Sequence, residues 1–166
     1  MKKVVFIHKF KSKLGWFRLA STEKGLAIIN FTDPCGFKSE IKKRFGDFQV
    51  KAGGEANKKA EKQIVSYLTG KLKKFSLKLD IEGTSFQRQV LRKVGSIPYG
   101  KTNTYGKIAA SVGNPKAARA VGSVNARNMI PIVIPCHRVL AVNGLGGYAG
   151  GLKLKRYLLN LEKAKF

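Results

Sequence analysis

The sequence predicts an α+β protein built in two parts, a small α/β part followed by a helical part. The first part, residues 1–75, contains short runs of β-branched and aromatic residues separated by turns. The second part, residues 84–166, contains apolar residues repeated at helical spacing. A Lys-rich extended stretch over 71–83 separates them, and we place the linker at 76–83. A chain of 166 residues has room for two such small domains.

Three strands and two helices are expected in the first part. The β-rich runs predict a small antiparallel sheet with strands at 4–7, 15–19 and 26–31. Residues 39–45 form a weaker helical pattern. Residues 55–68 form a stronger one, because their apolar residues fall on one face, and Gly70 is suited to end that helix.

Three helices are expected to open the second part. Thr84 can cap the first of them, and Gln87 three residues later would complete a capping box. The second is expected over 104–112. The third is expected over 115–125, with Asn114 as its cap and a proline at its first position.

The last two of these helices meet across a turn that contains Gly113, which is the layout of a helix-turn-helix. Lys116 and Arg119 lie on the outward face of the second helix, where DNA would be contacted. Helix pairs of this kind also occur in proteins that bind no DNA. A purely structural role therefore stays open at this point.

A stiff apolar segment precedes a Cys-His pair. Pro131 and Pro135 bracket this segment and exclude a helix there. Cys136 and His137 follow immediately. Five glycines between positions 144 and 151 then form a loop whose backbone can approach a ligand closely.

An amphipathic helix is expected to close the chain over 152–163. Its inward face is expected to carry the leucines at the helical repeat, Leu154, Leu158 and Leu161.

The net charge is +24, from 33 Lys and Arg against 9 Asp and Glu. Residues 1–80 hold 19 bases and 7 acids, and residues 81–166 hold 14 and 2, so each part carries +12. Such a chain attracts polyanions, nucleic acid first and an anionic membrane second. The same charge could serve only to keep the chain dissolved.

No stretch approaches the roughly 20 apolar residues of a membrane span. The first residues also lack a signal-peptide pattern. We therefore expect a cytoplasmic protein with no membrane partner.

The two cysteines are too few for a disulfide scaffold, and with the two histidines they are too scattered for a closed zinc site. We therefore expect no metal.

Cys35 fits the usual role of a small buried apolar residue. Cys136 has a neighbouring base in His137, which would itself need a carboxylate to orient it. Only Glu82 and Glu162 are available after residue 80, and Glu162 lies on the closing helix. A buried cysteine beside a surface histidine remains the alternative.

The second part resembles the 6-O-alkylguanine-DNA alkyltransferase family from about residue 84 to residue 164. The resemblance rests on four stretches in the right order: Pro98–Tyr105, Asn114–Gly122, Ile132–Val139 with its Pro-Cys-His-Arg sequence, and Gly147–Leu152 with the helix that ends in Glu162. The first part resembles the family only loosely.

The resemblance implies a ribonuclease-H-like first domain and a winged helix-turn-helix second domain. Its partner would be double-stranded DNA that carries an alkylated guanine, and the protein would act as a monomer without a cofactor. The recognition helix would enter the minor groove, where the damaged nucleotide is flipped out and Arg119 fills the gap. Residues implied to lie at the DNA are Lys116, Ala118, Arg119, Gly122 and Ser123.

The same resemblance implies roles around the flipped base. Cys136 would be the nucleophile and irreversible alkyl acceptor, with His137 and Glu162 as its relay. Tyr105 would direct its hydroxyl at the purine ring and the amide of Ala149 would face the exocyclic oxygen. The carbonyls of Cys136 and Val139 would accept hydrogen bonds from the guanine amino group. Asn128 would connect the recognition helix to the cysteine turn.

Two departures and two rival functions accompany this interpretation. Members often carry zinc in the first domain, and no ligands for it are visible here. Some members have Ser at position 149, but the role implied there belongs to the backbone amide, which Ala also supplies.

A lesion sensor of the alkyltransferase-like kind is one rival, but such proteins lack the cysteine. A cysteine hydrolase is the other, although it would leave the helix-turn-helix unexplained. Glu162 could also act only by pinning its helix through a salt bridge, for example to an arginine.

Overall fold

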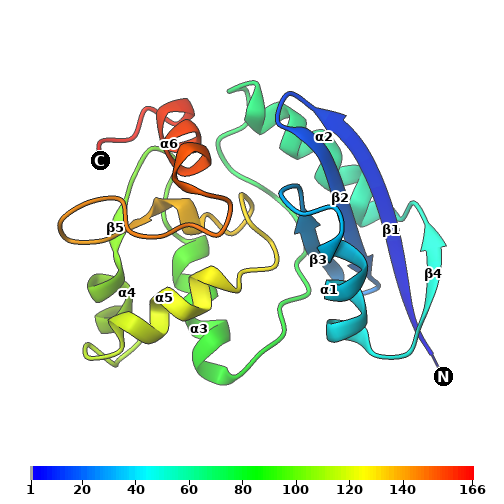
Figure 1. The fold of residues 1–166 in the computed structure, drawn as a ribbon, viewed down its shortest axis with the longest axis horizontal. Helices are drawn as coiled ribbons and strands as arrows, with labels where there is room; N and C mark the ends of the chain where they lie inside the picture. Colours follow the sequence, from blue (N-terminus) through cyan, green and yellow to red (C-terminus); the bar gives the residue numbers. More distant parts are fainter. Residues whose placement is uncertain (1) are drawn as a thin grey trace. The chain divides into compact units, whose positions relative to one another are not determined.

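The computed structural model describes residues 2–166, which divide into two units, one ending at Ile81 and the other covering Glu82–Phe166. The first unit holds a four-stranded sheet with two helices, and the second is mainly helical (Figure 1). The predicted fold class, a small α/β part followed by a helical part, is confirmed. Within the described residues, no helix is both long enough and apolar enough to cross a membrane.

The sheet has the strand order β3-β2-β1-β4. Its strands are β1 (Lys3–Ser12), β2 (Gly15–Thr22), β3 (Gly25–Asn30) and β4 (Phe48–Ala52). The pairs β1–β2 and β2–β3 are antiparallel, as predicted, whereas β4 pairs with β1 in parallel. The prediction of an all-antiparallel sheet of three strands was therefore wrong. Most of β4 is exposed, so it lacks the buried apolar run that signals a strand.

Two helices accompany this sheet. Helix α1 (Gly36–Phe45) begins three residues before the predicted start at position 39 and connects β3 to β4. Helix α2 (Glu55–Leu68) has the predicted bounds and packs against β1, β2 and β3. Its buried face contains Ile64 and Tyr67, as its apolar pattern predicts.

The end of the first unit pairs with the sheet. Leu26 on β3 donates its amide to the carbonyl of Lys78 at 2.9 Å, and Asp80 donates its amide to Leu26 at 2.8 Å. Gly25 has φ +139, and a Cβ there would lie 2.3 Å from the carbonyl oxygen of Lys78. Residues 78–80, inside the stretch that we place as the linker, are therefore held against β3.

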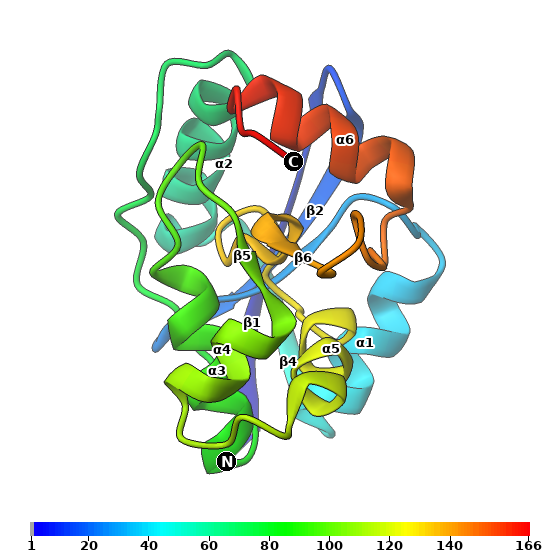
Figure 2. The same cartoon turned by 90° about the vertical axis from the view of Figure 1, so that its left-hand side faces the viewer.

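The helices of the second unit surround a short segment that carries Cys136. These elements are α3 (Ser85–Gly95), α4 (Tyr105–Ser111), α5 (Ala118–Ala126), the 3₁₀ turn η1 (Cys136–Arg138) and α6 (Leu152–Leu161). Strand β5 (Asn103–Thr104) pairs in parallel with β6 (Val139–Leu140), which follows η1. In both views this pair lies between α6 on one side and α3–α5 on the other (Figures 1 and 2).

Local signals determine where α3 begins but not where α5 begins. The predicted capping box is present, since Gln87 donates its amide to the Thr84 hydroxyl at 3.2 Å and its side chain accepts from the Thr84 amide. The predicted Asn114 cap and Pro115 start of α5 were wrong. Ala117 donates to the carbonyl of Asn114 and so closes a separate turn, and the helix itself starts at Ala118.

The inward face of α6 also differs from the prediction. Leu158 is buried as expected, but Leu154 and Leu161 are only half-buried. Their places in the core are taken by Leu159 and by the charged residue Lys155, which has no exposed surface. A helical repeat of leucines does not reveal a lysine that is compensated by the surrounding backbone.

Candidate active site

A tight turn positions Cys136. Ile134 donates its amide to the carbonyl of Ile130, and the amide of Cys136 donates to Ile134 at 2.8 Å. Ile132 has φ +73, a conformation that β-branched residues rarely adopt, so the surrounding packing must hold it. The turn places Cys136 at the start of η1 with 6% of its surface exposed.

The thiol forms part of the wall of a pocket of about 640 Å³. The other walls include Tyr105 on α4, Ala118, Arg119 and Gly122 on α5, and Tyr148 and Ala149 in the loop before α6. The side-chain amide of Asn125 and the hydroxyl of Tyr148 are buried here and have no hydrogen-bond partner among the described residues. Buried polar groups normally have partners, so this pocket suits a ligand with polar edges.

Asn128 holds the cysteine turn together. Its side-chain amide donates to the carbonyl of Ile134 at 2.9 Å and to the sulfur of Cys136 at 3.2 Å. Its carbonyl oxygen accepts from the amide of Ile130 at 3.0 Å. Asn128 directly follows the C-cap of α5, so it connects that helix to the nucleophile segment.

Burial raises the pKa of the Cys136 thiol. The Asn128 hydrogen bond, the ammonium of Lys155 and the backbone N–H groups of Cys136 and His137 all oppose this by favouring the thiolate. Since burial has the largest effect, the resting group is a thiol that requires a base.

His137 and Glu162 form a buried pair. The Nε2 of His137 lies 2.8 Å from Oε1 of Glu162, and both side chains have no exposed surface. Burial lowers the pKa of His137, while the Glu162 carboxylate works to raise it. The imidazole is therefore neutral at neutral pH and can accept a proton, after which the carboxylate stabilises the imidazolium.

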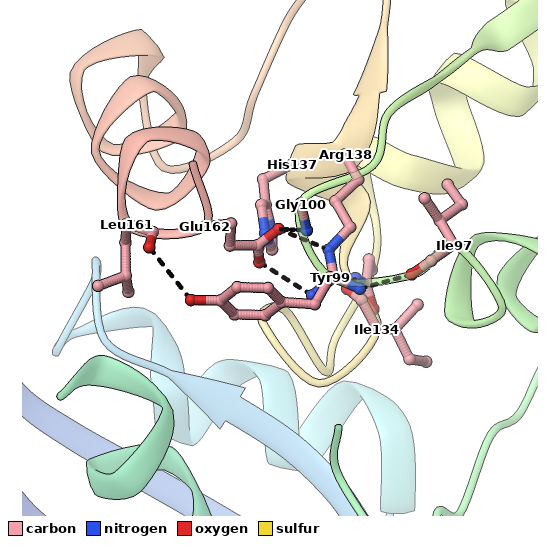
Figure 3. Close-up of polar contacts among 9 residues, drawn as sticks. Ile97, Tyr99, Gly100, Ile134, His137, Arg138, Leu161 and Glu162 are labelled. Atoms are coloured by element: carbon pink, nitrogen blue, oxygen red, sulfur yellow. Dashed lines mark hydrogen bonds and ion pairs between the residues drawn. The ribbon is translucent and has the colours of Figure 1, made fainter. Parts of the chain in front are cut away.

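Arg138 is a further partner of Glu162: a salt bridge from Glu162 to an arginine was among the alternatives that the sequence left open, although the sequence did not single out Arg138. Its Nε and Nη2 donate to the two oxygens of Glu162, each at 2.9 Å, and its Nη1 donates to the carbonyl of Ile97 at 2.5 Å. The amide of Gly100 also donates to Glu162 at 3.2 Å (Figure 3). A lone carboxylate in a basic part of the chain was the available signal that a cation would pair with it.

Tyr105 begins α4 and reaches across the pocket. Its hydroxyl donates to the carbonyl of Gly147 at 3.4 Å. Burial raises the pKa of Tyr105, and the nearby Cys136 raises it further. Gly146, with φ +69, allows the loop to pass over this ring, because a Cβ there would lie 2.8 Å from it. The hydroxyl thus keeps its proton at neutral pH and can donate a hydrogen bond.

The structure distributes the remaining predicted residues in three ways. Ala118, Arg119, Gly122 and Ala149 line the pocket. Lys116 and Ser123 are exposed outside it, and Lys116 precedes α5 rather than lying on it. The carbonyl of Val139 accepts from Lys155 at 2.6 Å. A carbonyl has two lone pairs, so that of Val139 retains capacity for a second donor.

The described residues do not fit a zinc ion. Within residues 2–166, no group of three or more Cys, His, Asp or Glu side chains is placed to hold a metal. The one short imidazole–carboxylate contact in the first unit joins only His8 and Glu61, at 2.5 Å.

The second unit thus places a buried cysteine, followed in sequence by a histidine that pairs with a buried carboxylate, in the wall of a pocket that α4 and α5 also line, an arrangement typical of proteins that use cysteine as a nucleophile. Two family models match the chain: the ribonuclease-like domain of 6-O-methylguanine DNA methyltransferase over residues 5–81, and the DNA binding domain of the same family over residues 85–164. The chain belongs to the 6-O-methylguanine DNA methyltransferase family.

Relatives and solved structures are similar to this chain over most of its length. The methylated-DNA--protein-cysteine methyltransferase of Methanosarcina acetivorans is 47% identical, with 92% of this chain and 95% of that protein aligned. The crystal structure of the Mycobacterium tuberculosis O6-methylguanine methyltransferase matches with a TM-score of 0.82 and 38% identity, covering 96% and 93% of the two chains. A structure of the M. tuberculosis protein in complex with DNA matches with a TM-score of 0.81 and 36% identity, covering 96% and 92%.

Proposed function

We propose that this chain repairs alkylated DNA by direct reversal, moving the alkyl group from the O6 atom of guanine to the sulfur of Cys136, once and irreversibly. The observation that carries the proposal is the buried Cys136 thiol in the wall of a pocket that the second helix of a helix-turn-helix also lines. A base flipped out of the duplex would enter this pocket.

The proposed reaction is a substitution at the alkyl carbon. His137 takes the thiol proton of Cys136, directly or through water, and Glu162 stabilises the imidazolium. The sulfur then bonds to the alkyl carbon as the carbon–oxygen bond breaks, and the electron pair stays on the purine. Tyr105 donates a hydrogen bond to that developing charge. The purine anion then takes up one proton on a ring nitrogen to become guanine, and the imidazolium of His137 releases the proton that it took from the thiol, so the step balances. The thioether on Cys136 has no leaving route.

The proposed base contacts come from both sides of the pocket. The backbone amide of Ala149 faces the exocyclic oxygen, and the carbonyls of Cys136 and Val139 accept from the guanine amino group. Asn128 positions the cysteine turn through the hydrogen bonds described above. On the DNA side, Arg119 fills the gap left by the flipped base. Lys116, Ala118, Gly122 and Ser123 approach the minor groove.

We assign both DNA binding and transfer to residues 84–166, following the predicted domain boundaries. We also propose that the protein acts as a monomer in the cytoplasm and needs no cofactor for transfer.

Counting the guanines restored per protein chain tests this proposal against its rivals. The protein is incubated with excess duplex that contains 6-O-methylguanine, and the restored guanine is quantified. Alkyl transfer to the protein predicts a plateau at one guanine per chain. A lesion sensor would restore none, and a hydrolase would continue beyond one; either result would overturn the proposal.

Arg119→Ala should slow repair in duplex DNA by about tenfold or more, and should change the reaction with the free modified base little. Arg119 is exposed at the pocket on α5, so we assign it to holding the flipped state rather than to the substitution. Lys116→Ala controls for the loss of one positive charge at the DNA, because Lys116 lies just before that helix and outside the pocket; it should weaken duplex binding without the same loss of repair rate once the duplex is saturating. An equal loss on both substrates would exclude the assignment of Arg119.

Binding to undamaged duplex should weaken at least about tenfold between about 50 mM and about 200 mM salt, because Lys and Arg contacts release counterions. The net charge of +24 motivates this expectation. Fluorescence anisotropy with a labelled duplex measures it. A flat salt dependence would mean that the charge does not serve DNA binding.

A further inference from the structure

Lys155 lies on α6 and has no exposed surface, whereas the other charged residues of this helix, Lys153 and Arg156, are exposed. Burying a cation is costly unless it is compensated by hydrogen bonds. Its ammonium donates to three backbone carbonyls: Val139 at 2.6 Å, Leu145 at 2.5 Å and Gly147 at 3.0 Å. All three donors of the ammonium therefore have acceptors.

Those carbonyls belong to two segments of the candidate site. Val139 follows the turn that carries Cys136, and Leu145 and Gly147 belong to the loop that continues into the pocket wall at Tyr148 and Ala149. The Gly147 carbonyl also accepts from Tyr105. One side chain of α6 thus connects the segment after the nucleophile to the loop that faces it.

The charge of Lys155 also acts on the nucleophile. Its ammonium lowers the pKa of Cys136, and the Cys136 sulfur raises that of Lys155 in return. Burial lowers the pKa of Lys155 to about 8, so it is mostly protonated at neutral pH. The same ammonium also lowers the pKa of His137. Glu162 pairs with His137 and Arg138.

We propose that Lys155 is a positioning residue for alkyl transfer, which holds the pocket loop against the nucleophile segment and whose positive charge favours the thiolate of Cys136. This inference rests on the proposed function. A buried methionine would fill the same volume without the cost of burying a charge, and it would supply neither the three hydrogen bonds nor the field at the sulfur.

The test measures the pH dependence of Cys136 alkylation by iodoacetamide, in a Cys35→Ser background that leaves one reactive thiol. Lys155→Met should raise the apparent pKa of Cys136 and lower its alkylation rate at pH 7 about tenfold, because less thiolate is present. Lys155→Arg keeps the charge and should restore most of the thiolate. Lys153→Met removes a charge from an exposed position on the same helix and should change neither quantity.

An unchanged Cys136 pKa in Lys155→Met would overturn the inference, even if the melting temperature fell, because that is the result of a structural role alone. If Lys155→Met fails to fold, the pH dependence of the wild-type protein tests the inference instead. Its alkyl transfer from the free base, corrected for the thiolate fraction, should decline above pH 8 as Lys155 loses its proton. Tyr105 and Tyr148 stay protonated there, since burial raises the pKa of each. No decline would refute the inference. Iodoacetamide needs no alkylated guanine, so failure of the proposed function would be seen separately, as wild type that restores no guanine.

Discussion

Cys136→Ala should abolish transfer of the alkyl group while leaving binding to the lesion-bearing duplex intact. The change removes only the sulfur, and Asn128 keeps its hydrogen bonds to Ile134 and Ile130, so the turn that shapes the pocket should persist. Loss of transfer should be complete, since no other residue of the pocket wall is a cysteine. Binding is measured with the same duplex by anisotropy, and transfer by the restored guanine.

The matched control for this variant is Cys35→Ser. Cys35 is exposed and lies in the first unit, so its loss should leave both transfer and binding unchanged. If Cys136→Ala still restored guanine, or if Cys35→Ser prevented it, the assignment of the nucleophile would be wrong. Loss of binding together with transfer would instead mean that the thiol shapes the pocket.

Glu162→Gln should both slow transfer and destabilise the protein. The carboxylate neutralises two buried cations, the fixed charge of Arg138 and the imidazolium that forms on His137. Removing one member of a buried ion pair costs about 3 kcal/mol in unfolding free energy, because the other charge is left uncompensated. Without the carboxylate, His137 becomes a weaker base, so the apparent pKa of Cys136, taken from the pH dependence of alkylation, should rise.

Two measurements separate these effects. A thermal melt reports the loss of stability, and the pH profile of alkylation reports the pKa of Cys136. Glu82→Gln is the control, because Glu82 is the other carboxylate after residue 80 and is exposed. A lower melting temperature with an unchanged Cys136 pKa would make Glu162 purely structural and would remove it from the relay.

The parts of the fold that the sequence predicts well depend on local signals. The Thr84–Gln87 capping box and helix α2 follow from patterns within one or two turns of chain, and the structure contains both. The start of α5 was missed because Asn114 and Pro115 suit an isolated turn as well as a helix start. Strand β4 was missed because its pairing with β1 is a long-range contact that leaves most of its side chains exposed.

The residues of the candidate site whose side chains are themselves reactive could be predicted from the sequence. Cys136, His137 and Glu162 were singled out from the sequence and its family resemblance, and the structure brings His137 and Glu162 into contact. Lys155 was missed, and Arg138 was not identified as the arginine that could pair with Glu162, because their partners are backbone carbonyls and a distant carboxylate. Backbone carbonyls exist at every position of a chain, so only the fold reveals which of them surround a buried cation.

The most direct test of the account is to locate the transferred group. Wild-type protein is incubated with duplex that contains 6-O-methylguanine, digested, and mapped by tandem mass spectrometry. We expect one methyl group per chain, carried by the sulfur of Cys136, with Cys35 unmodified. Methyl on Cys35, or restored guanine with no modified residue in the chain, would contradict it.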